Sequence, residues 1–375
     1  MKGLWLSLTA ILLLSICAAA GNSSDSQPSS SLLQVFVEPT DGYKPVLDAL
    51  NSAQSSILVE MYLLTDKNIM RALENASSRG IKVRVMLEEL AYQNPADLKA
   101  IMDAFNSSGI FVKASSPAFS LTHEKAIIVD KKIALIMTLN QDHTAYTKNR
   151  EFGIIDGDPR DIAEITSTFD ADWNRTVPEL SDPNLVWSPV NSRERIIALL
   201  DAANRSLEVE NEEMQDKVVE DHLIAAAKRG VDVKVVMSPP ESMSPSKSKK
   251  DANAPGRNRI SKGGVKVCLV TKPYIHAKLI TADGSEAFVG SENFSPTSLD
   301  RNRELGILVN DSNIIRVLSS TFDADWNAGN QTLSNLSKQV SPVKAKYIKS
   351  GKFTKRFQGQ IRKKDNCLTR AIFIF

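Results

Sequence analysis

Short runs of apolar residues, separated by polar positions, follow each other in a regular order along residues 32–180. The apolar run at 57–64 and the alternating run at 81–87 predict strands, and the helical spacing over 68–78, ended by Gly80, predicts a helix between them. Further strands are predicted at 126–129, 133–137 and 152–155, and a closing helix at 161–173. Strands separated by helices favour an α/β sandwich with a mixed sheet.

Residues 181–340 predict the same order of elements a second time. The strands fall at 207–209, 231–237, 279–281, 287–289 and 305–309, and the helices at 218–228 and 313–326. Phe169 and Trp173 are four positions apart in the first closing helix, as are Phe322 and Trp326 in the second. That spacing puts each pair on one helix face, so we expect both pairs to pack in the core.

The two halves differ in one segment. Residues 95–106 of the first half predict a helix, whereas the corresponding residues 239–264 are rich in serine, proline, lysine and arginine. This composition predicts a mobile basic loop in the second half.

Direct comparison of residues shows that the halves are copies of each other. Residues 167–174 recur as 320–327, and Asn149-Arg150-Glu151 recurs as Asn302-Arg303-Glu304, both shifted by 153 positions. Arg79-Gly80 recurs as Arg229-Gly230 with a shift of 150, so small insertions lie between. This self-similarity indicates a duplication, with the first repeat at 32–180 and the second at 181–340.

The ends of the chain have a different composition. Lys2 followed by an apolar run and small residues predicts a signal peptide over residues 1–20, and the serine-rich residues 21–31 predict a linker. A secreted or cell-surface protein is therefore expected. The net charge of +2 divides into a basic tail at 341–375, with ten lysines and arginines from Lys344 to Arg370, and a slightly acidic remainder. The tail could contact an anionic membrane surface or nucleic acid, or be solvated without a partner.

The candidate chemistry lies in a motif that occurs once in each half. Two of the four histidines begin a His-x-Lys-x4-Asp sequence, and an asparagine and a glutamate follow each motif at the same distances. The two sets are His123, Lys125, Asp130, Asn140 and Glu151, and His276, Lys278, Asp283, Asn293 and Glu304. Chance would not place both in register with the duplication. His143 and His222 lack counterparts, and we expect them at the surface.

Histidine and lysine two positions apart on a strand point to the same side. If the halves pack about a pseudo-twofold axis, two imidazoles and two ammonium groups meet in one pocket, which suits a phosphodiester. Lysine and asparagine would hold the non-bridging oxygens, one imidazole would attack phosphorus, and the other would protonate the leaving oxygen. Glu151 and Glu304 could bind ring N–H groups and fix the tautomer. Zinc is disfavoured, because lysine is not a usual ligand and only two cysteines, Cys268 and Cys367, follow the predicted signal peptide.

Over residues 32–330, these paired motifs resemble the phospholipase D superfamily. Gly290-Ser291-Glu292-Asn293 after the second motif fits the family pattern, whereas the first motif is followed by Met137-Thr138-Leu139-Asn140. The resemblance implies a duplicated phospholipase D-like α/β sandwich, whose two pseudo-twofold-related halves share one active site.

The resemblance also implies roles for individual residues, without a metal or other cofactor. His123 would be the nucleophile that forms a phosphohistidine and His276 the general acid, although the reverse assignment stays open. Phosphate would be bound by Lys125, Lys278, Asn140 and Asn293, with Ser291 assisting. Asp130 and Asp283 would support the structure rather than contact substrate.

Three classes of function fit this site. The first is a phospholipase D acting on phospholipid headgroups, favoured by the signal peptide and by two motifs in one chain. The second is an endonuclease that uses the positive charge of residues 239–264 and of the tail to follow a nucleic-acid backbone. The third is a non-catalytic protein that binds anionic phosphate, against which the intact motifs argue. A cardiolipin synthase-like transferase usually carries apolar membrane segments, and none follows residue 20.

Overall fold

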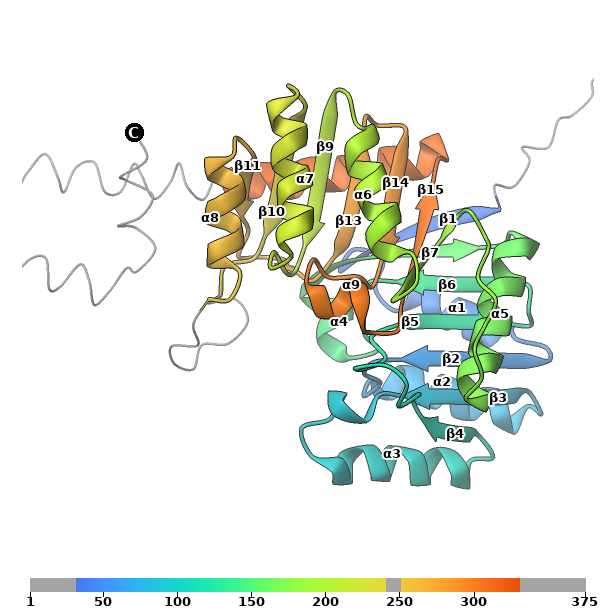
Figure 1. Ribbon diagram of the computed structural model, residues 1–375. Coiled ribbons are helices and arrows are strands. Elements are labelled where there is room, and N and C mark those ends of the chain that lie inside the picture. Colours follow the sequence, from blue (N-terminus) through green and yellow to red (C-terminus); the bar gives the residue numbers. More distant parts are fainter. Residues whose placement is uncertain (1–31, 241–250, 331–375) are drawn as a thin grey trace, which may run out of the picture. The chain divides into compact units, whose positions relative to one another are not determined.

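The computed structural model describes residues 32–240 and 251–330 (Figure 1). The predicted signal peptide at 1–20, the linker at 21–31 and the tail at 341–375, with Cys367, lie outside the described residues. Among the described residues, no helix is both long and apolar enough to cross a membrane.

The first half is built on a mixed sheet with the strand order β1-β7-β6-β5-β2-β3-β4. Its strands are β1 (Leu33–Glu38), β2 (Ser56–Met61), β3 (Lys82–Leu87), β4 (Phe111–Ala114), β5 (Lys125–Val129), β6 (Ile133–Met137) and β7 (Asn149–Asp156). The β2-β3-β4 part is parallel, and every other pair is antiparallel. This arrangement confirms the mixed α/β sheet predicted from the sequence.

The second half repeats that order as β11-β10-β9-β13-β14-β15-β8. Its strands are β8 (Leu185–Ser188), β9 (Ser206–Asn211), β10 (Asp232–Met237), β11 (Lys266–Leu269), β13 (Lys278–Ala282), β14 (Glu286–Gly290) and β15 (Glu304–Val309). A short strand, β12 (Tyr274–Ile275), pairs with β7 of the first half. In return, Thr122 of the first half forms a parallel bridge to Arg303 of the second. Such reciprocal contacts are what a twofold relation between the halves produces.

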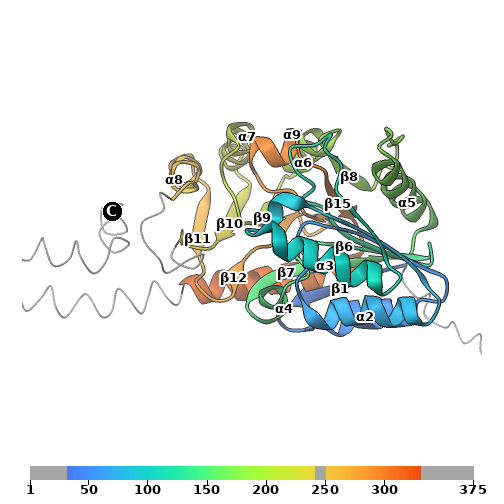
Figure 2. The same ribbon diagram turned by 90° about the horizontal axis from the view of Figure 1, so that it is seen from below.

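Helices cover the outer face of each sheet. The first sheet carries α1 (Lys44–Ser52), α2 (Lys67–Ser78), α3 (Pro95–Ser107) and α4 (His143–Thr147), and the second carries α6 (Ser192–Ala202), α7 (Lys217–Lys228), α8 (Ala254–Lys262) and α9 (Pro296–Asp300) (Figures 1 and 2). A one-turn 3-10 helix spans Glu89–Ala91. Asp66 and Asp216 begin α2 and α7 in the same way, because each carboxylate accepts two backbone N–H groups of the first turn.

The inner faces of both sheets meet in one shared apolar core. Two further helices, α5 (Pro159–Asn174) and the helix over residues 312–330, contribute to it. As predicted, Phe169 and Phe322 are buried there, and their rings stack on Trp173 and Trp326 at centroid distances of 5.8 and 6.1 Å. Because both halves line the same core, neither sheet buries its inner face alone.

Two buried ion pairs join the halves, and they are formed by residues that recur in the duplication. Arg150 on β7 pairs with Asp325 of the second half at 2.5 Å, and Arg303 pairs with Asp172 on α5 at 2.8 Å. All four side chains are buried. The sequences Asn-Arg-Glu and Phe-Asp-Ala-Asp-Trp-Asn therefore recur because each supplies one partner of a buried ion pair between the halves.

The prediction of a basic loop over 239–264 is wrong for its later part. Residues 254–262 form α8, whose buried Ile260 packs against the second sheet. Proline breaks most helices, but Pro255 occupies the first turn of α8, where its missing N–H costs nothing. Lys247, Lys249 and Lys250 lie outside the described residues.

Candidate active site

His123 lies just before β5 and is held by the opposite half. Its backbone N–H donates to the carbonyl of Arg303 at 2.8 Å, and its ring Nδ1 lies 2.8 Å from Oε2 of Glu304 on β15. The side chain is 12% exposed, so one edge of the ring remains accessible. Burial lowers the pKa of His123, and Glu304 opposes this effect. A neutral ring that donates Nδ1–H to Glu304 leaves the lone pair of Nε2 free.

His276 occupies the equivalent position before β13. Its backbone N–H donates to the carbonyl of Arg150 at 3.3 Å, and Nδ1 lies 2.8 Å from Oε1 of Glu151 on β7. The side chain is 11% exposed. Each histidine is therefore paired with the glutamate of the other half, a crossing that the sequence does not specify. The two motifs thus form one shared site.

Both glutamates are anchored as ionised carboxylates. Glu151 accepts hydrogen bonds from Thr138 and Asn149 at 2.6 and 3.2 Å, and Glu304 accepts from Ser298 and Asn302 at 2.6 and 3.0 Å. Burial alone would raise the pKa of each carboxyl group. The facing histidine, the nearby lysine and the hydroxyl donor outweigh burial, and the pKa of both groups is lowered.

The two motif lysines are fully buried beneath the histidines. Lys125 donates to the carbonyl oxygen of His123, and Lys278 donates to that of His276. Burial, with Lys278 nearby, lowers the pKa of Lys125 to about 7, although Glu304 acts in the opposite direction. Lys278 has a second partner, Glu212, at 3.2 Å. The two cationic positions are therefore not equivalent.

The residues predicted to assist at the phosphate have different surroundings. Asn140 and Asn293 follow β6 and β14, and the buried side-chain oxygen of each has no hydrogen-bond partner among the described residues. Ser291 is fully buried, and its hydroxyl accepts the N–H of Leu305 at 3.1 Å, which ties β14 to β15. Thr138, its counterpart, accepts the N–H of Phe152 and donates to Glu151. Thr138 therefore orients the carboxylate of Glu151, and phosphate binding by the asparagines and Ser291 stays a prediction.

Asp130 and Asp283 lie beyond the other end of β5 and β13, away from the histidines. Each adopts a positive φ in the turn after its strand and accepts backbone N–H groups from the segment before β2 or β9. Burial opposes ionisation, but these hydrogen bonds prevail and lower the pKa of Asp130 to about 2. The motif aspartates thus clamp a turn to the neighbouring strand.

Two residues next to the histidines were not anticipated. Tyr62 follows β2, and its ring lies edge-on to that of His123, with centroids 4.7 Å apart. Glu212 follows β9 at the equivalent position, and its Oε2 lies 3.3 Å from Nε2 of His276. The shift of 150 that relates Arg79 to Arg229 also relates Tyr62 to Glu212, so the repeat contained the signal. Because the two side chains differ, matching identical residues between the halves does not reveal them.

Other polar groups lie outside this site. His143 is exposed and His222 pairs with Asp201 on the outer surface, as predicted. Within residues 32–240 and 251–330, no three histidine, cysteine or acidic side chains are placed to hold a metal ion.

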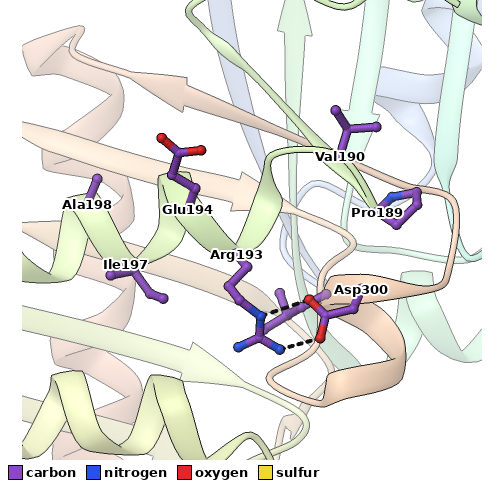
Figure 3. A pocket seen from close by; sticks show the side chains of 8 residues that line it. Pro189, Val190, Arg193, Glu194, Ile197, Ala198 and Asp300 are labelled. Atoms are coloured by element: carbon purple, nitrogen blue, oxygen red, sulfur yellow. Dashed lines mark hydrogen bonds and ion pairs between the residues drawn. The ribbon is translucent and has the colours of Figure 1, made fainter.

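A hollow of about 550 Å³ lies over α6 and α9 and is not part of the candidate active site. It is open to the surface, and Figure 3 shows Arg193 paired with Asp300 along its wall. Arg193 also binds Asp216, the residue that caps α7. These contacts give Arg193 a structural role, and none of the motif residues lines the hollow.

Comparison with known proteins agrees with this geometry. The family model described as "Cardiolipin synthase, PLD-like domain" matches twice, at residues 46–173 and 196–326. Cardiolipin synthase 2 of Staphylococcus epidermidis is 22% identical over 347 residues, covering 79% of this chain and 68% of the relative. Cardiolipin synthase B of Salmonella typhimurium is 24% identical over 326 residues, covering 74% and 76%.

Solved structures share the fold. The phosphatidylserine synthase of Haemophilus influenzae superimposes with a TM-score of 0.61 at 12% identity, covering 85% of this chain and 95% of that one. The polyphosphate kinase of Porphyromonas gingivalis also reaches 0.61, at 17% identity, covering 78% of this chain and 50% of that one. The family model alone spans more than half of the chain, once in each half. The chain therefore belongs to the PLD-like domain family, within the phospholipase D superfamily of phosphodiester-processing enzymes, and carries that domain twice.

Proposed function

We propose that this chain is a metal-independent phosphodiesterase that removes the headgroup of phospholipids through a covalent phosphohistidine. The observation that carries the proposal is the reciprocal pairing of His123 with Glu304 and of His276 with Glu151. Glu304 hydrogen-bonds Nδ1 of His123 and orients that ring, and Glu151 lies 2.8 Å from Nδ1 of His276, so each imidazole faces a carboxylate of the opposite half.

The proposed reaction has two steps. Nε2 of His123 attacks phosphorus, the bond from phosphorus to the headgroup oxygen breaks, and His276 gives a proton to that oxygen. Water then attacks the phosphohistidine, its proton passes to His276, and the phosphorus–nitrogen bond breaks. Phosphatidic acid and the original ring remain. Lys125 and Lys278 stabilise the charge that develops on the non-bridging oxygens.

Transfer to an alcohol is the second candidate. The relatives are named cardiolipin synthases, which favours phospholipid as the substrate, and in such a reaction an alcohol replaces water in the second step.

The nuclease proposal loses part of its support. Three of the basic residues assigned to a loop belong to α8, and two of them are already neutralised: Arg257 pairs with Asp251, and Arg259 pairs with Glu220 and Asp221. The charges of Arg257 and Arg259 therefore stabilise α8 and are not available to bind a phosphate backbone.

We also propose that the chain is exported, on the pattern of residues 1–20. Amino-terminal sequencing of the protein recovered from the medium or cell surface tests this. A start near Gly21 supports export with cleavage, and recovery only from inside the cell contradicts it.

The full chain in excess EDTA would be incubated with mixed phospholipid vesicles, with and without glycerol, and with single-stranded DNA. Phosphatidic acid and free headgroup support hydrolysis. Phosphatidylglycerol without phosphatidic acid shows transfer, and DNA fragments with intact lipid show a nuclease. Absence of turnover on all substrates, with retained vesicle binding, supports the non-catalytic binder.

A further inference from the structure

The two motif lysines have different neighbours at equivalent positions of the repeat. Tyr62 follows β2, and Nζ of Lys125 lies 5.2 Å from the centre of its ring. Glu212 follows β9, and its Oε2 accepts a hydrogen bond from Nζ of Lys278 at 3.2 Å. The first half therefore presents an aromatic ring to its lysine, whereas the second half presents a carboxylate.

The carboxylate of Glu212 is held by a hydrogen bond to each of its oxygens. The Tyr274 hydroxyl donates to Oε1 at 2.9 Å, while Oε2 accepts from Lys278. Burial alone would raise the pKa of Glu212, but His276, Lys278 and the Tyr274 hydroxyl hold that pKa well below its ordinary value. Glu212 is therefore ionised. Its side chain is 16% exposed, so an entering ligand can come close to the carboxylate.

The position of Glu212 matters because Lys278 is a proposed phosphate ligand. The Lys278 ammonium group has three N–H donors, of which the carbonyl of His276 accepts one and Glu212 accepts another. A phosphate oxygen that takes a hydrogen bond from Lys278 must therefore lie near the Glu212 carboxylate. Glu151 and Glu304 already match the two lysines in charge, so Glu212 adds negative charge to the site.

This added charge does not affect all phosphate ligands equally. A phosphodiester carries one negative charge, whereas a phosphomonoester carries nearly two above pH 7, because its second pKa is about 6. Coulomb repulsion is proportional to the charge of the ligand, so a fixed carboxylate repels a monoester about twice as strongly as a diester. The proposed hydrolysis converts a diester into a monoester, phosphatidic acid. The repulsion should therefore weaken the binding of product more than that of substrate.

We propose that Glu212 determines specificity by discriminating against dianionic phosphomonoesters, and that it thereby favours release of the phosphatidic acid product. The inference rests on the proposed function, which makes Lys278 a ligand of the phosphate. Tyr62, at the equivalent position beside Lys125, is uncharged, so the second half supplies the discrimination.

Two small ligands that differ by one methyl group and one charge test this inference. At pH 8, dimethyl phosphate is a monoanion and methyl phosphate is a dianion. Phosphorus-31 NMR titration of the full chain at constant ionic strength measures both dissociation constants. The unmodified protein should bind dimethyl phosphate more tightly, although the two lysines alone would favour the dianion. Tighter binding of methyl phosphate to the unmodified protein overturns the inference.

Glu212→Gln removes the charge and keeps an oxygen that can accept from Tyr274. Affinity should rise about tenfold for dimethyl phosphate and about 10²-fold for methyl phosphate, because the dianion loses twice the repulsion. Glu208→Gln is the matched control, because it removes the same charge from β9 at a residue that pairs with Thr281 instead. It should change neither affinity by more than about twofold. Equal gains for the two ligands in Glu212→Gln, or no gain, overturn the inference.

Product inhibition gives a second readout and separates this inference from the proposed function. Phosphatidic acid added to phosphatidylcholine vesicles should inhibit Glu212→Gln at an about tenfold lower concentration than it inhibits the unmodified protein, and equal inhibition contradicts the inference. If the unmodified protein cleaves no phospholipid while the two small ligands respond as expected, the proposed function fails and the discrimination by Glu212 stands. If the protein cleaves phospholipid but the ligands respond equally, the proposed function stands and the inference fails.

Discussion

The two halves of the active site share a backbone framework but differ in the side chains around each histidine. Contacts that join the halves occur twice: Arg150 with Asp325 and Arg303 with Asp172, and each histidine with the glutamate opposite. The flanking positions differ, with Tyr62 and Glu124 in the first half and Glu212 and Ala277 in the second. The residues that join the two halves are therefore identical in both repeats, whereas these residues beside the histidines differ.

Replacing the proposed nucleophile should have the largest effect and should distinguish the roles of the two motif histidines. His123→Asn removes the atom that forms the phosphohistidine, so turnover should fall about 10³- to 10⁴-fold and no covalent adduct should form. His276→Asn should lower turnover of phospholipid comparably, yet still form the adduct with bis(p-nitrophenyl) phosphate, whose leaving group needs no proton. Quenched-flow mass spectrometry measures the adduct. An adduct on His276 in the His123 variant would reverse the assignment.

The ion pairs between the halves should have the next largest effect, on stability. Asp325→Asn leaves Arg150 charged and buried without its partner, so the free energy of unfolding should fall by about 3–5 kcal/mol. Asp172→Asn should do the same to Arg303. Asp170→Asn, on the same helix as Asp172, breaks a partly exposed pair with Arg84 and should cost less than about 1 kcal/mol. Urea unfolding measures all three, and equal losses would show that the buried pairs have no special role.

The two motif lysines allow the halves to be compared by making the same substitution in each. Lys125 is buried without a carboxylate at hydrogen-bond distance among the described residues, so Lys125→Met should raise the free energy of unfolding by about 1–3 kcal/mol while abolishing activity. The pKa of Lys125 in the folded state is about 7, below its ordinary value, so the native state binds fewer protons than the unfolded state above pH 7. The stability of the unmodified protein should therefore rise with pH, and the gain from Met should shrink.

Lys278→Met is the counterpart of that variant. It removes one partner of the largely enclosed Glu212 carboxylate, so it should not stabilise the protein at any pH. Urea unfolding at pH 6 and pH 9 measures both variants. Equal gains for both lysines would contradict the asymmetry of the site.

Most of the architecture could be predicted because its signals are local and occur twice. The helix at 68–78 and the strands at 133–137 and 305–309 follow from periodicity alone, and the structure confirms them within one residue. The helix α8 was missed because Pro255 and Gly256 are breakers in most contexts, and only the packing of Ile260 favours a helix there.

The residues of the candidate site could be predicted from the sequence, but their contacts with each other could not. Spacing brought two histidines, two lysines and two glutamates together, yet which glutamate faces which histidine depends on how the halves dock. Glu212 and Tyr62 were missed because they occupy equivalent positions of the repeat but have different side chains. A search of the repeat for unequal charges at equivalent positions would have found them, and Glu124 with Ala277 as well.

Glu124 gives the finest test of the comparison. It lies between the motif residues His123 and Lys125 but faces the buried pair of Arg303 and Asp172, whereas Ala277 carries no charge at the equivalent position. Burial raises the pKa of Glu124 to about 8, although Arg303 opposes the shift. The native state therefore binds more protons than the unfolded state between about pH 4.5 and 8, and stability is lost as pH rises through that window. Glu124→Gln should gain stability at pH 8 and nothing below pH 4.5, and the exposed Glu89→Gln should gain nothing at either pH. Because Glu60 beside it also has a raised pKa, some pH dependence should persist in Glu124→Gln. A gain that is equal at both pH values would instead assign the effect of Glu124 to packing, and the first half would then differ from the second in shape rather than in charge.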